Sequence, residues 1–183
     1  LNSPGIDRRP IRQINGDAEF AEMFFDGVRV PRENLLGPLN DGWKVTMTTL
    51  DHERNALVGY IARLNHQVEN MVNHYRCRLD DLSADELVQR YVEAAVLDAV
   101  CTDSVESVRA TGAPGPEQTI IKLEWSLLDQ RLTNTALNLA GATAIAGTDD
   151  TAALGYLSER SATIAGGTTE ILTGIIARRV LGL

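Results

Sequence analysis

The feature that most constrains the fold is a long run in which apolar residues recur every three or four positions. Arg54 takes the one position of this run that lacks an apolar side chain, and the other members are Trp43, Met47, Leu50, Leu57, Ile61, Leu64, Val68 and Met71. This spacing is that of one face of an α-helix, so it predicts a single helix from Trp43 to about Tyr75. At ~1.5 Å per residue that helix is about 50 Å long, and only other long helices can cover it.

Further apolar stripes of the same period predict the partners of this helix. The second stripe ends near Gly112, and the third begins at Ile121 and is closed by Gly141. A weaker helical segment covers 151–161, and a last helix starts around Thr168. Long amphipathic helices bury such faces together as an antiparallel bundle. The predicted fold class is therefore mainly α, with a four-helix-bundle-like domain.

The first 38 residues predict β structure instead. A short strand at 10–14, an Asn-Gly turn at 15–16 and an apolar-rich run at 20–30 indicate a hairpin. Two strands alone are barely stable, so we expect this hairpin to be the last part of a β domain whose earlier strands are missing. The predicted domains are a β remnant at 1–38 and a helical bundle at 39–183.

Composition narrows the function classes. A net charge of -8 and a pI near 4.9 argue against nucleic-acid binding, which depends on clustered Lys and Arg. No run approaches the ~18 apolar residues that a membrane span needs. The two cysteines, Cys77 and Cys101, lack metal-ligand spacing and are expected to be reduced thiols of a cytoplasmic protein. The chain starts in a loop-like sequence without an initiator Met, so we expect it to belong to a longer protein.

The three histidines do not follow the spacing of a metal site. His52 precedes Glu53 directly, His66 and His74 are eight residues apart, and the sequence has neither a Glu-x-x-His pair nor a His-Glu-x-x-His motif. Solvated or packed histidines are the more common case. We therefore predict no metal site.

Two short motifs could carry chemistry. In the first, residues 50–54 (LDHER), Arg54 interrupts the apolar stripe and needs a partner or ligand that offsets its desolvation. Taken alone, an exposed Glu53 beside a structurally paired Arg54 is the simpler interpretation. The second motif, residues 166–170 (GGTTE), opens a helix whose N–H groups could face an anion. A plain helix start with Thr168 as the N-cap explains the same pattern.

Taken together, five segments resemble the acyl-CoA dehydrogenase family. They are EMFFDGVRVP at 22–31, NDGW at 40–43, LDHER at 50–54, IAGGTTEI at 164–171 and ARRVLG at 177–182. They occur in the order that the family has and spread over nearly the whole chain. The resemblance implies the C-terminal half of such a protein, which is the tail of its β domain followed by its helical-bundle domain.

The resemblance also implies a reaction and a base. The family oxidises the α,β bond of an acyl-CoA: a carboxylate removes the α proton while the β hydrogen leaves as hydride to FAD. In many members the base is a Glu at the position that matches Gly166, which has no side chain. In isovaleryl- and long-chain-type members the base lies at the position that matches Glu53. The resemblance therefore implies Glu53 as the base and Arg54 as a residue that shapes the active site.

Cofactor contacts follow from the same resemblance. Gly167, Thr168 and Glu170 match the turn that approaches FAD. Asn138 and Gly141 match a Gln-x-x-Gly-Gly segment that touches the ADP part of FAD from a neighbouring subunit, with Asn in place of Gln. The family's Arg-x-Phe-Gly motif, whose arginine reaches an FAD phosphate, is absent from this sequence. In lacking this motif, the chain resembles actinobacterial-type members, some of which assemble from two unlike subunits that share the FAD sites.

The implied partners are an acyl-CoA substrate of fatty acid or lipid β-oxidation, an electron-transfer flavoprotein or similar acceptor, and other subunits of a homo- or hetero-oligomer. Straight-chain, branched and sterol-side-chain thioesters all remain open as substrates. Two other hypotheses stand beside the oxidoreductase: a non-catalytic partner subunit that completes a neighbour's FAD site, and a generic helical interaction module. Because much of the family's acyl-CoA and flavin sites lies in domains missing here, we expect the chain alone to be inactive.

Overall fold

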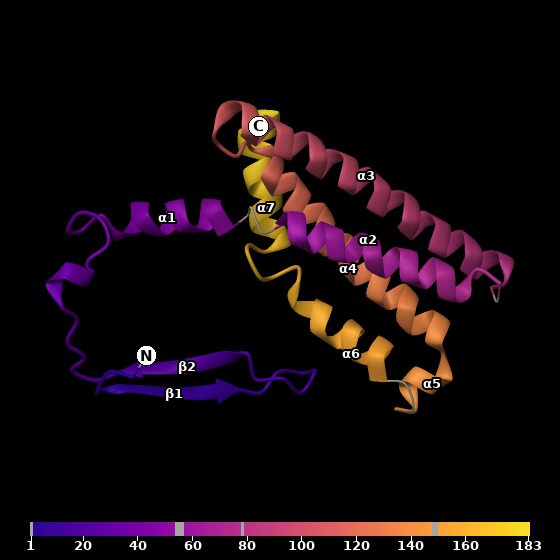
Figure 1. Ribbon diagram of the computed structural model, residues 1–183, viewed down its shortest axis with the longest axis horizontal. Helices are drawn as coiled ribbons and strands as arrows, with labels where there is room; N and C mark the ends of the chain where they lie inside the picture. The colour runs from indigo at the N-terminus through magenta and orange to yellow at the C-terminus, as the bar shows by residue number, and fades with distance from the viewer. Residues whose placement is uncertain (1, 54–56, 78, 148–149) are drawn as a thin grey trace. The chain divides into compact units, whose positions relative to one another are not determined.

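A computed structural model describes residues 2–53, 57–77, 79–147 and 150–183 of the chain (Figure 1). The chain forms two compact units, Leu1–Thr49 and Leu50–Leu183. The first contains a β-hairpin, a short 3-10 turn at Arg32–Asn34 and the greater part of a helix, whereas the second is a bundle of helices. The predicted domain boundary after residue 38 stays a prediction.

The hairpin of the first unit consists of β1 (Ile6–Ile11) and β2 (Phe20–Phe25), which pair antiparallel. A backbone hydrogen bond from the Gln13 N–H to the Asp17 carbonyl, 2.8 Å long, closes the connection between them. The predicted bounds of the first strand, 10–14, are wrong because pairing with β2 decides where the strand begins and ends. The residues after Ile11 leave the ladder to form the connection.

Two described helices cover the region of the predicted long first helix. They are α1 (Gly42–Glu53) and α2 (Leu57–Tyr75), so the predicted helix end near Tyr75 is confirmed. Residues 54–56 lie outside the described part of the chain, and so does the interruption of the apolar stripe by Arg54. The buried residues of α2 have the predicted spacing: Leu57, Ile61, Leu64 and Val68.

Local signals set the ends of the two long helices that follow. Helix α3 (Asp81–Thr111) begins after the capping side chain of Asp80 and ends at Gly112, whose φ is 75°. Helix α4 (Glu117–Ala140) ends at Gly141, whose φ is 61°. Glycine adopts such positive φ angles without the steric cost of a Cβ, and both predicted helix stops are confirmed.

Shorter elements complete the second unit. They are α5 (Ala142–Ile145), α6 (Asp150–Ser158), the 3-10 turn η3 (Glu159–Ser161), α7 (Thr169–Ile176) and the π-helical turn η4 (Ala177–Leu181). Helix α4 contacts α2, α3, α6 and α7, and Figure 1 shows it running through the middle of the bundle. The predicted mainly α fold, a helical bundle after a short β segment, is confirmed.

The core of the bundle joins α2, α3 and α4. Its largest fully buried apolar side chains include Ile61, Leu64, Ile121, Leu128 and Leu132. Burying an aliphatic side chain of this size contributes roughly 1.5–3 kcal/mol to stability. No helix in the described part of the chain combines the length and the apolarity that a membrane crossing requires.

Candidate functional site

Residues 162–168, between η3 and α7, form a series of tight turns that we call the glycine loop. Gly166 and Gly167 have φ angles of 70° and 123°, in a region that residues with side chains rarely adopt. A Cβ on Gly167 would lie 3.1 Å from Leu172 Cδ2, and one on Gly166 would lie 3.5 Å from Lys122 Cε. The loop backbone therefore runs close to α4 and α7 with two successive positions free of side chains.

Replacing Gly167 with Ala should destabilise the bundle by about 1–3 kcal/mol, because the new side chain meets both the unfavourable φ and Leu172. Gly174→Ala is the matched control, since Gly174 lies inside α7 without a positive φ and its Cβ would make ordinary contacts, with Arg178 Nη1 at 3.5 Å. There we expect unchanged or slightly higher stability. Thermal melts compare the two variants, and equal melting temperatures would contradict the role given to Gly167.

The loop leads into a capped helix. Thr168 Oγ1 accepts a hydrogen bond of 3.3 Å from the Ile171 N–H, so the predicted N-cap role of Thr168 is confirmed. Hydrogen bonds from its own backbone N–H and then from the Thr168 side chain lower the pKa of Glu170. Gly167, Thr168 and Glu170, three of the predicted flavin contacts, therefore lie together at the start of α7.

A buried lysine of α4 lies beneath this loop. The Lys122 side chain is inside the bundle, and its ammonium group donates to the carbonyl of Ala162 at 2.8 Å and to that of Gly167 at 3.3 Å. Desolvation by burial lowers the pKa of Lys122. No local signal in the sequence singles out Lys122, because a lysine next to Ile121 in an amphipathic helix is usually solvated.

Two more polar side chains fasten the loop to α4. Gln130 Nε2 donates to the Arg160 carbonyl at 3.3 Å and to Thr163 Oγ1 at 2.9 Å. In return, Arg160 Nη2 donates to the Gln130 carbonyl at 3.1 Å and to Thr133 Oγ1 at 3.2 Å. Together with Lys122, these bonds fix the start, the middle and the end of the segment that precedes α7.

A chain of ring and cation contacts connects the glycine loop with the first turn of α2. The rings of Tyr60 and Trp125 are stacked, with their centroids 4.8 Å apart. Lys122 Nζ lies 5.7 Å from the centroid of the Trp125 ring and donates to the Gly167 carbonyl. The N-terminus of α2 and the glycine loop therefore lie at the same end of α4.

Glu53, the predicted base, is the last residue of α1 and is exposed. Arg54, its predicted companion, lies outside the described residues. Leu57 follows Glu53 by four residues. A segment of four residues spans at most about 14 Å even when it is fully extended. The Glu53 backbone is therefore confined to the neighbourhood of the α2 N-terminus.

Two other predicted site residues lie at the opposite end of α4. Asn138 is exposed in the last turn of the helix, and Gly141 caps it with an N–H that donates to the Leu137 carbonyl. Sixteen positions separate Asn138 from Lys122, which corresponds to about 24 Å along a helix. The structure thus places Asn138 and Gly141 away from Gly167, Thr168 and Glu170.

A buried carboxylate, Asp129, lies beside the half-exposed Arg63 and the carboxylate of Glu159, near the start of the glycine loop. Arg63 Nη2 lies 2.8 Å from Glu159 Oε1 and 3.5 Å from Asp129 Oδ2, and the Asp129 side chain is only 1% exposed. Burial, and then a hydrogen bond and repulsion from Glu159, raise the pKa of Asp129 to about 7, against the opposing effect of Arg63 and Arg160. Burial and the neighbouring Glu159 carboxylate therefore favour the protonated form of Asp129.

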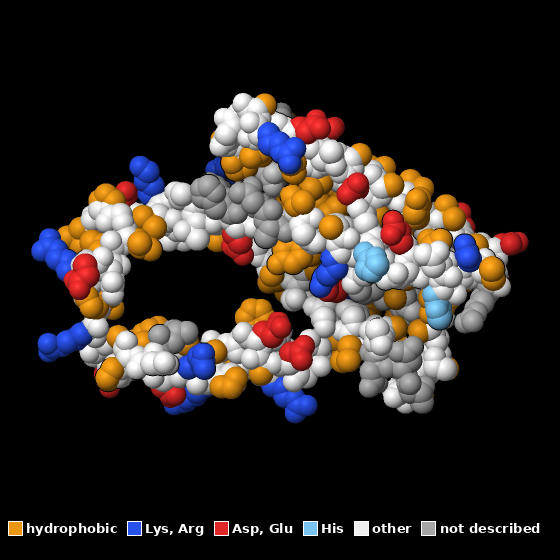
Figure 2. All heavy atoms as spheres, viewed as in Figure 1, with side chains coloured by type: hydrophobic (Ala, Val, Ile, Leu, Met, Phe, Trp, Pro, Cys, Tyr) orange, Lys and Arg blue, Asp and Glu red, His pale blue; other side chains and the backbone are white. Residues whose placement is uncertain are grey.

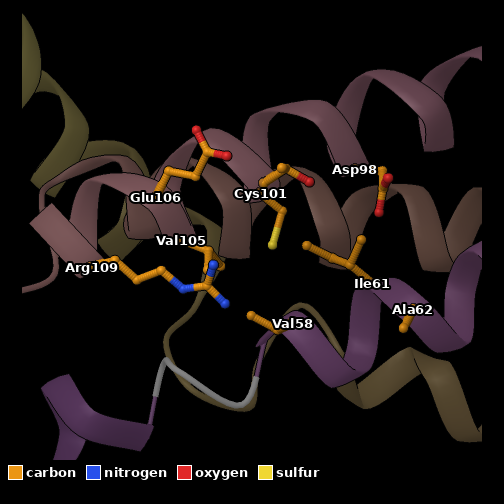
Figure 3. Close-up of a pocket in the computed structure, with 9 residues that line it drawn as sticks. Val58, Ile61, Ala62, Asp98, Cys101, Val105, Glu106 and Arg109 are labelled. Carbon is orange, nitrogen blue, oxygen red and sulfur yellow. The ribbon is translucent and has the colours of Figure 1, made fainter.

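A separate cleft of about 270 Å³ opens between α2 and α3. Figure 3 shows the Arg109 side chain extending toward it, with Cys101, Val105 and Val58 nearby. Burial, and then the charge of Asp98, raise the pKa of the Cys101 thiol. None of the predicted site residues lines this cleft, so we distinguish it from the site around the glycine loop.

No group of three His, Cys, Asp or Glu side chains that could hold a metal ion exists among residues 2–53, 57–77, 79–147 and 150–183. The described polar groups instead surround a loop with exposed backbone. Gly166 is exposed, and within the described residues no backbone carbonyl accepts a hydrogen bond from the Thr168 N–H. Such a backbone can approach a planar, anionic ligand closely.

The family model for the acyl-CoA dehydrogenase C-terminal domain matches residues 40–181. Among curated proteins, the chain is 36% identical over 192 residues to the acyl-CoA dehydrogenase IpdE1 of Mycolicibacterium smegmatis, covering 100% of the chain and 47% of that protein. It is 32% identical over 184 residues to the acyl-CoA dehydrogenase FadE34 of Mycobacterium tuberculosis, covering 100% of the chain and 26% of that protein. The chain thus spans half or less of the length of these relatives.

A solved structure has the same fold. The ChsE4-ChsE5 complex from Mycobacterium tuberculosis contains a chain that matches with a TM-score of 0.81 at 22% identity. The match covers 100% of the present chain and 51% of the other one. At this level of identity the likeness establishes the fold.

Proposed function

Because the chain belongs to the acyl-CoA dehydrogenase family, we propose that it is the C-terminal half of an FAD-dependent acyl-CoA dehydrogenase in which Glu53 is the base. In this proposal residues 1–38 are the end of the flavin-contacting β domain, and residues 39–183 are the helical-bundle domain. The Glu53 carboxylate takes the α proton of an acyl-CoA thioester. The β hydrogen leaves as hydride, for which bound FAD supplies the acceptor.

The observation that carries the proposal is the contact chain from Tyr60 through Trp125 and Lys122 to Gly167. It places the first turn of α2 at the same end of the bundle as the glycine loop. Glu53 is tethered to that turn, so its carboxylate and a cofactor at the loop can share one site. Chemistry that needs a base beside a flavin requires this proximity.

The residues of the glycine loop fit a flavin. Gly166 and Gly167 leave the backbone free for close approach, and the capped N-terminus of α7 at Thr168 offers N–H groups to a ligand with negative character. Glu170 lies next to them. We propose that Gly167, Thr168 and Glu170 contact FAD of the same subunit, and that Arg54 shapes the acyl-CoA side of the site.

Asn138 and Gly141 have a different role in this proposal. Their distance from the glycine loop along α4 suits a contact with the ADP part of a cofactor held by a neighbouring subunit. Apolar side chains exposed on α3 offer a surface for such a neighbour, and Figure 2 shows orange side chains recurring over this helix. They include Val88, Tyr91, Val92, Val96 and Val100. We therefore propose a cytoplasmic homo- or hetero-oligomer that passes electrons to an electron-transfer flavoprotein or similar acceptor.

A second candidate function is a non-catalytic partner subunit. The fold is shared with a chain of a complex that is named for two proteins, ChsE4 and ChsE5. In addition, Asn138 stands where the family has Gln. In this alternative the chain completes the FAD site of its neighbour, and Glu53 has no part in turnover.

The proposed function is tested by anaerobic titration of the complete, FAD-loaded protein with acyl-CoA thioesters of straight, branched and sterol-side-chain type. Bleaching of the flavin band near about 450 nm by at least one of them is the expected result. A flavin that stays oxidised with every thioester would contradict the dehydrogenase assignment. A complete protein that cannot be loaded with FAD would exclude both candidate functions, because each of them needs a flavin site.

The 183-residue chain by itself should bind FAD poorly and should not oxidise acyl-CoA. The reason is that the glycine loop supplies one face of a cofactor site, and most of the β domain that completes such a site in the family is missing from this chain. Equilibrium dialysis of the chain with FAD measures this directly. Tight, stoichiometric retention of FAD together with turnover would show the expectation to be wrong.

A further inference from the structure

The position of Lys122 differs from that of an ordinary helix lysine. The residue is only 3% exposed, and no carboxylate in the described part of the chain forms an ion pair with it. A buried ammonium group is costly unless hydrogen bonds replace its water. Here the replacement consists of two backbone carbonyls, those of Ala162 and Gly167. The buried ammonium group of Lys122 is therefore held by hydrogen bonds to the glycine loop.

These two carbonyls mark the beginning and the end of the loop. The chain turns here through two backbone hydrogen bonds. The Ala165 N–H donates to the Ser161 carbonyl, and the Gly167 N–H donates to the Ile164 carbonyl. One ammonium group that bonds both ends fixes the distance between them, and so fixes the path of the two glycines. The Lys122 methylene groups also pass under Gly166, where a Cβ would lie 3.5 Å from Cε.

The bond to Gly167 also acts on Thr168, the N-cap residue of the following helix. The Gly167 carbonyl and the Thr168 N–H belong to the same peptide group. A cation at the carbonyl oxygen polarises that group and makes its N–H a stronger donor. In the described part of the chain this N–H has no backbone acceptor, so it is free to face a ligand.

We propose that Lys122 is a positioning residue of the flavin site, which sets the path of the glycine loop and orients the Gly167–Thr168 peptide toward the cofactor. This inference rests on the proposed function and adds to it a residue that acts through the loop. Lys122 touches neither the substrate nor the reacting atoms in this proposal. Its contribution is to hold in place the loop backbone that contacts the cofactor.

The test uses the complete, FAD-loaded protein with Lys122→Met, which keeps the length and apolar stem of the side chain but donates no hydrogen bond. We expect FAD affinity to fall on the order of tenfold, as is typical when buried carbonyls lose charge-assisted donors. We also expect faster amide hydrogen exchange in residues 162–168, with unchanged exchange in α2 and α3. Lys122→Arg, which retains a cationic donor, should recover most of the affinity.

Lys44→Met is the matched control, because Lys44 is the other lysine of the chain and is exposed on α1. It should leave FAD affinity and loop exchange at the values of the unsubstituted protein. Lys122→Gln serves if Lys122→Met does not fold: it keeps an N–H donor without charge and should weaken FAD binding several-fold with faster loop exchange.

Two outcomes would overturn the inference while leaving the proposed function intact. One is an unsubstituted protein and a folded Lys122 variant, Met or Gln, that bind FAD equally well. The other is a variant that loses FAD while exchange in residues 162–168 does not change, because the loss would then not pass through the loop. An unsubstituted complete protein that binds no FAD would instead remove the proposed function on which the inference rests.

Discussion

Glu53→Gln should abolish acyl-CoA oxidation by the complete protein while FAD stays bound. A general base contributes about 10²–10⁴-fold to a rate, and an amide of the same shape cannot accept the α proton, so we expect a loss on the order of 10³-fold in kcat. Because Glu53 is exposed in the bundle, the substitution should leave the melting temperature unchanged. Steady-state turnover with an artificial acceptor and the flavin absorbance of the same sample measure both quantities.

Glu69→Gln provides the control for this experiment. Glu69 is also exposed, and it lies on α2 about three turns beyond Leu57, away from the glycine loop. It should keep full activity. If Glu53→Gln turns over as fast as Glu69→Gln, the base lies elsewhere, and the non-catalytic partner subunit becomes the better account of the chain.

Asp129→Asn should change the pH dependence of stability more than any surface substitution. The folded state holds a proton on Asp129 up to about pH 7, whereas the unfolded state loses it near the ordinary value of 3.8. Between these values the folded state binds more protons, so rising pH weakens folding. Asparagine cannot ionise and escapes this loss. Relative to the native protein, Asp129→Asn should therefore gain stability between pH 4 and pH 8, by about 2–4 kcal/mol.

The gain in stability of Asp129→Asn should come from removing the buried carboxylate beside Glu159, and not from the change in net charge. Asp103→Asn is the control, because Asp103 is exposed on α3 and its substitution removes the same formal charge. Melting temperatures of both variants are compared with the native protein across this pH range. A difference that does not grow with pH for Asp129→Asn would show that the pKa of Asp129 is not raised in the folded state. A difference that grows equally for Asp103→Asn would show an effect of net charge alone.

Local signals were sufficient to predict most of the helical architecture. Gly112, Gly141 and Thr168 mark helix ends in the sequence, and each does so in the structure, because a positive φ or a capping hydroxyl acts within a few residues. The bounds of β1 were predicted less well. They depend on pairing with β2, a later segment of the chain, and the sequence around β1 alone does not show which residues pair.

The candidate site was predictable only in part. The resemblance singled out Gly167, Thr168 and Glu170, and the structure brings these residues together at the start of α7. Lys122 and Asp129 were missed because charged residues in an amphipathic helix are usually solvated. Their burial is caused by a segment some 30 to 45 residues later in the chain, where Glu159, Ala162 and Gly167 lie. The catalytic role of Glu53 stays a prediction.

A structure of the complete protein with FAD and a non-reactive acyl-CoA analogue would show whether Glu53 is placed to act as the base. The quantity to measure is the distance from the Glu53 carboxylate to the thioester α carbon beside the flavin ring. We predict a separation of about 3–3.5 Å, with Gly167 and Thr168 in contact with the flavin. A Glu53 side chain that points into solvent, away from an occupied flavin site, would contradict it.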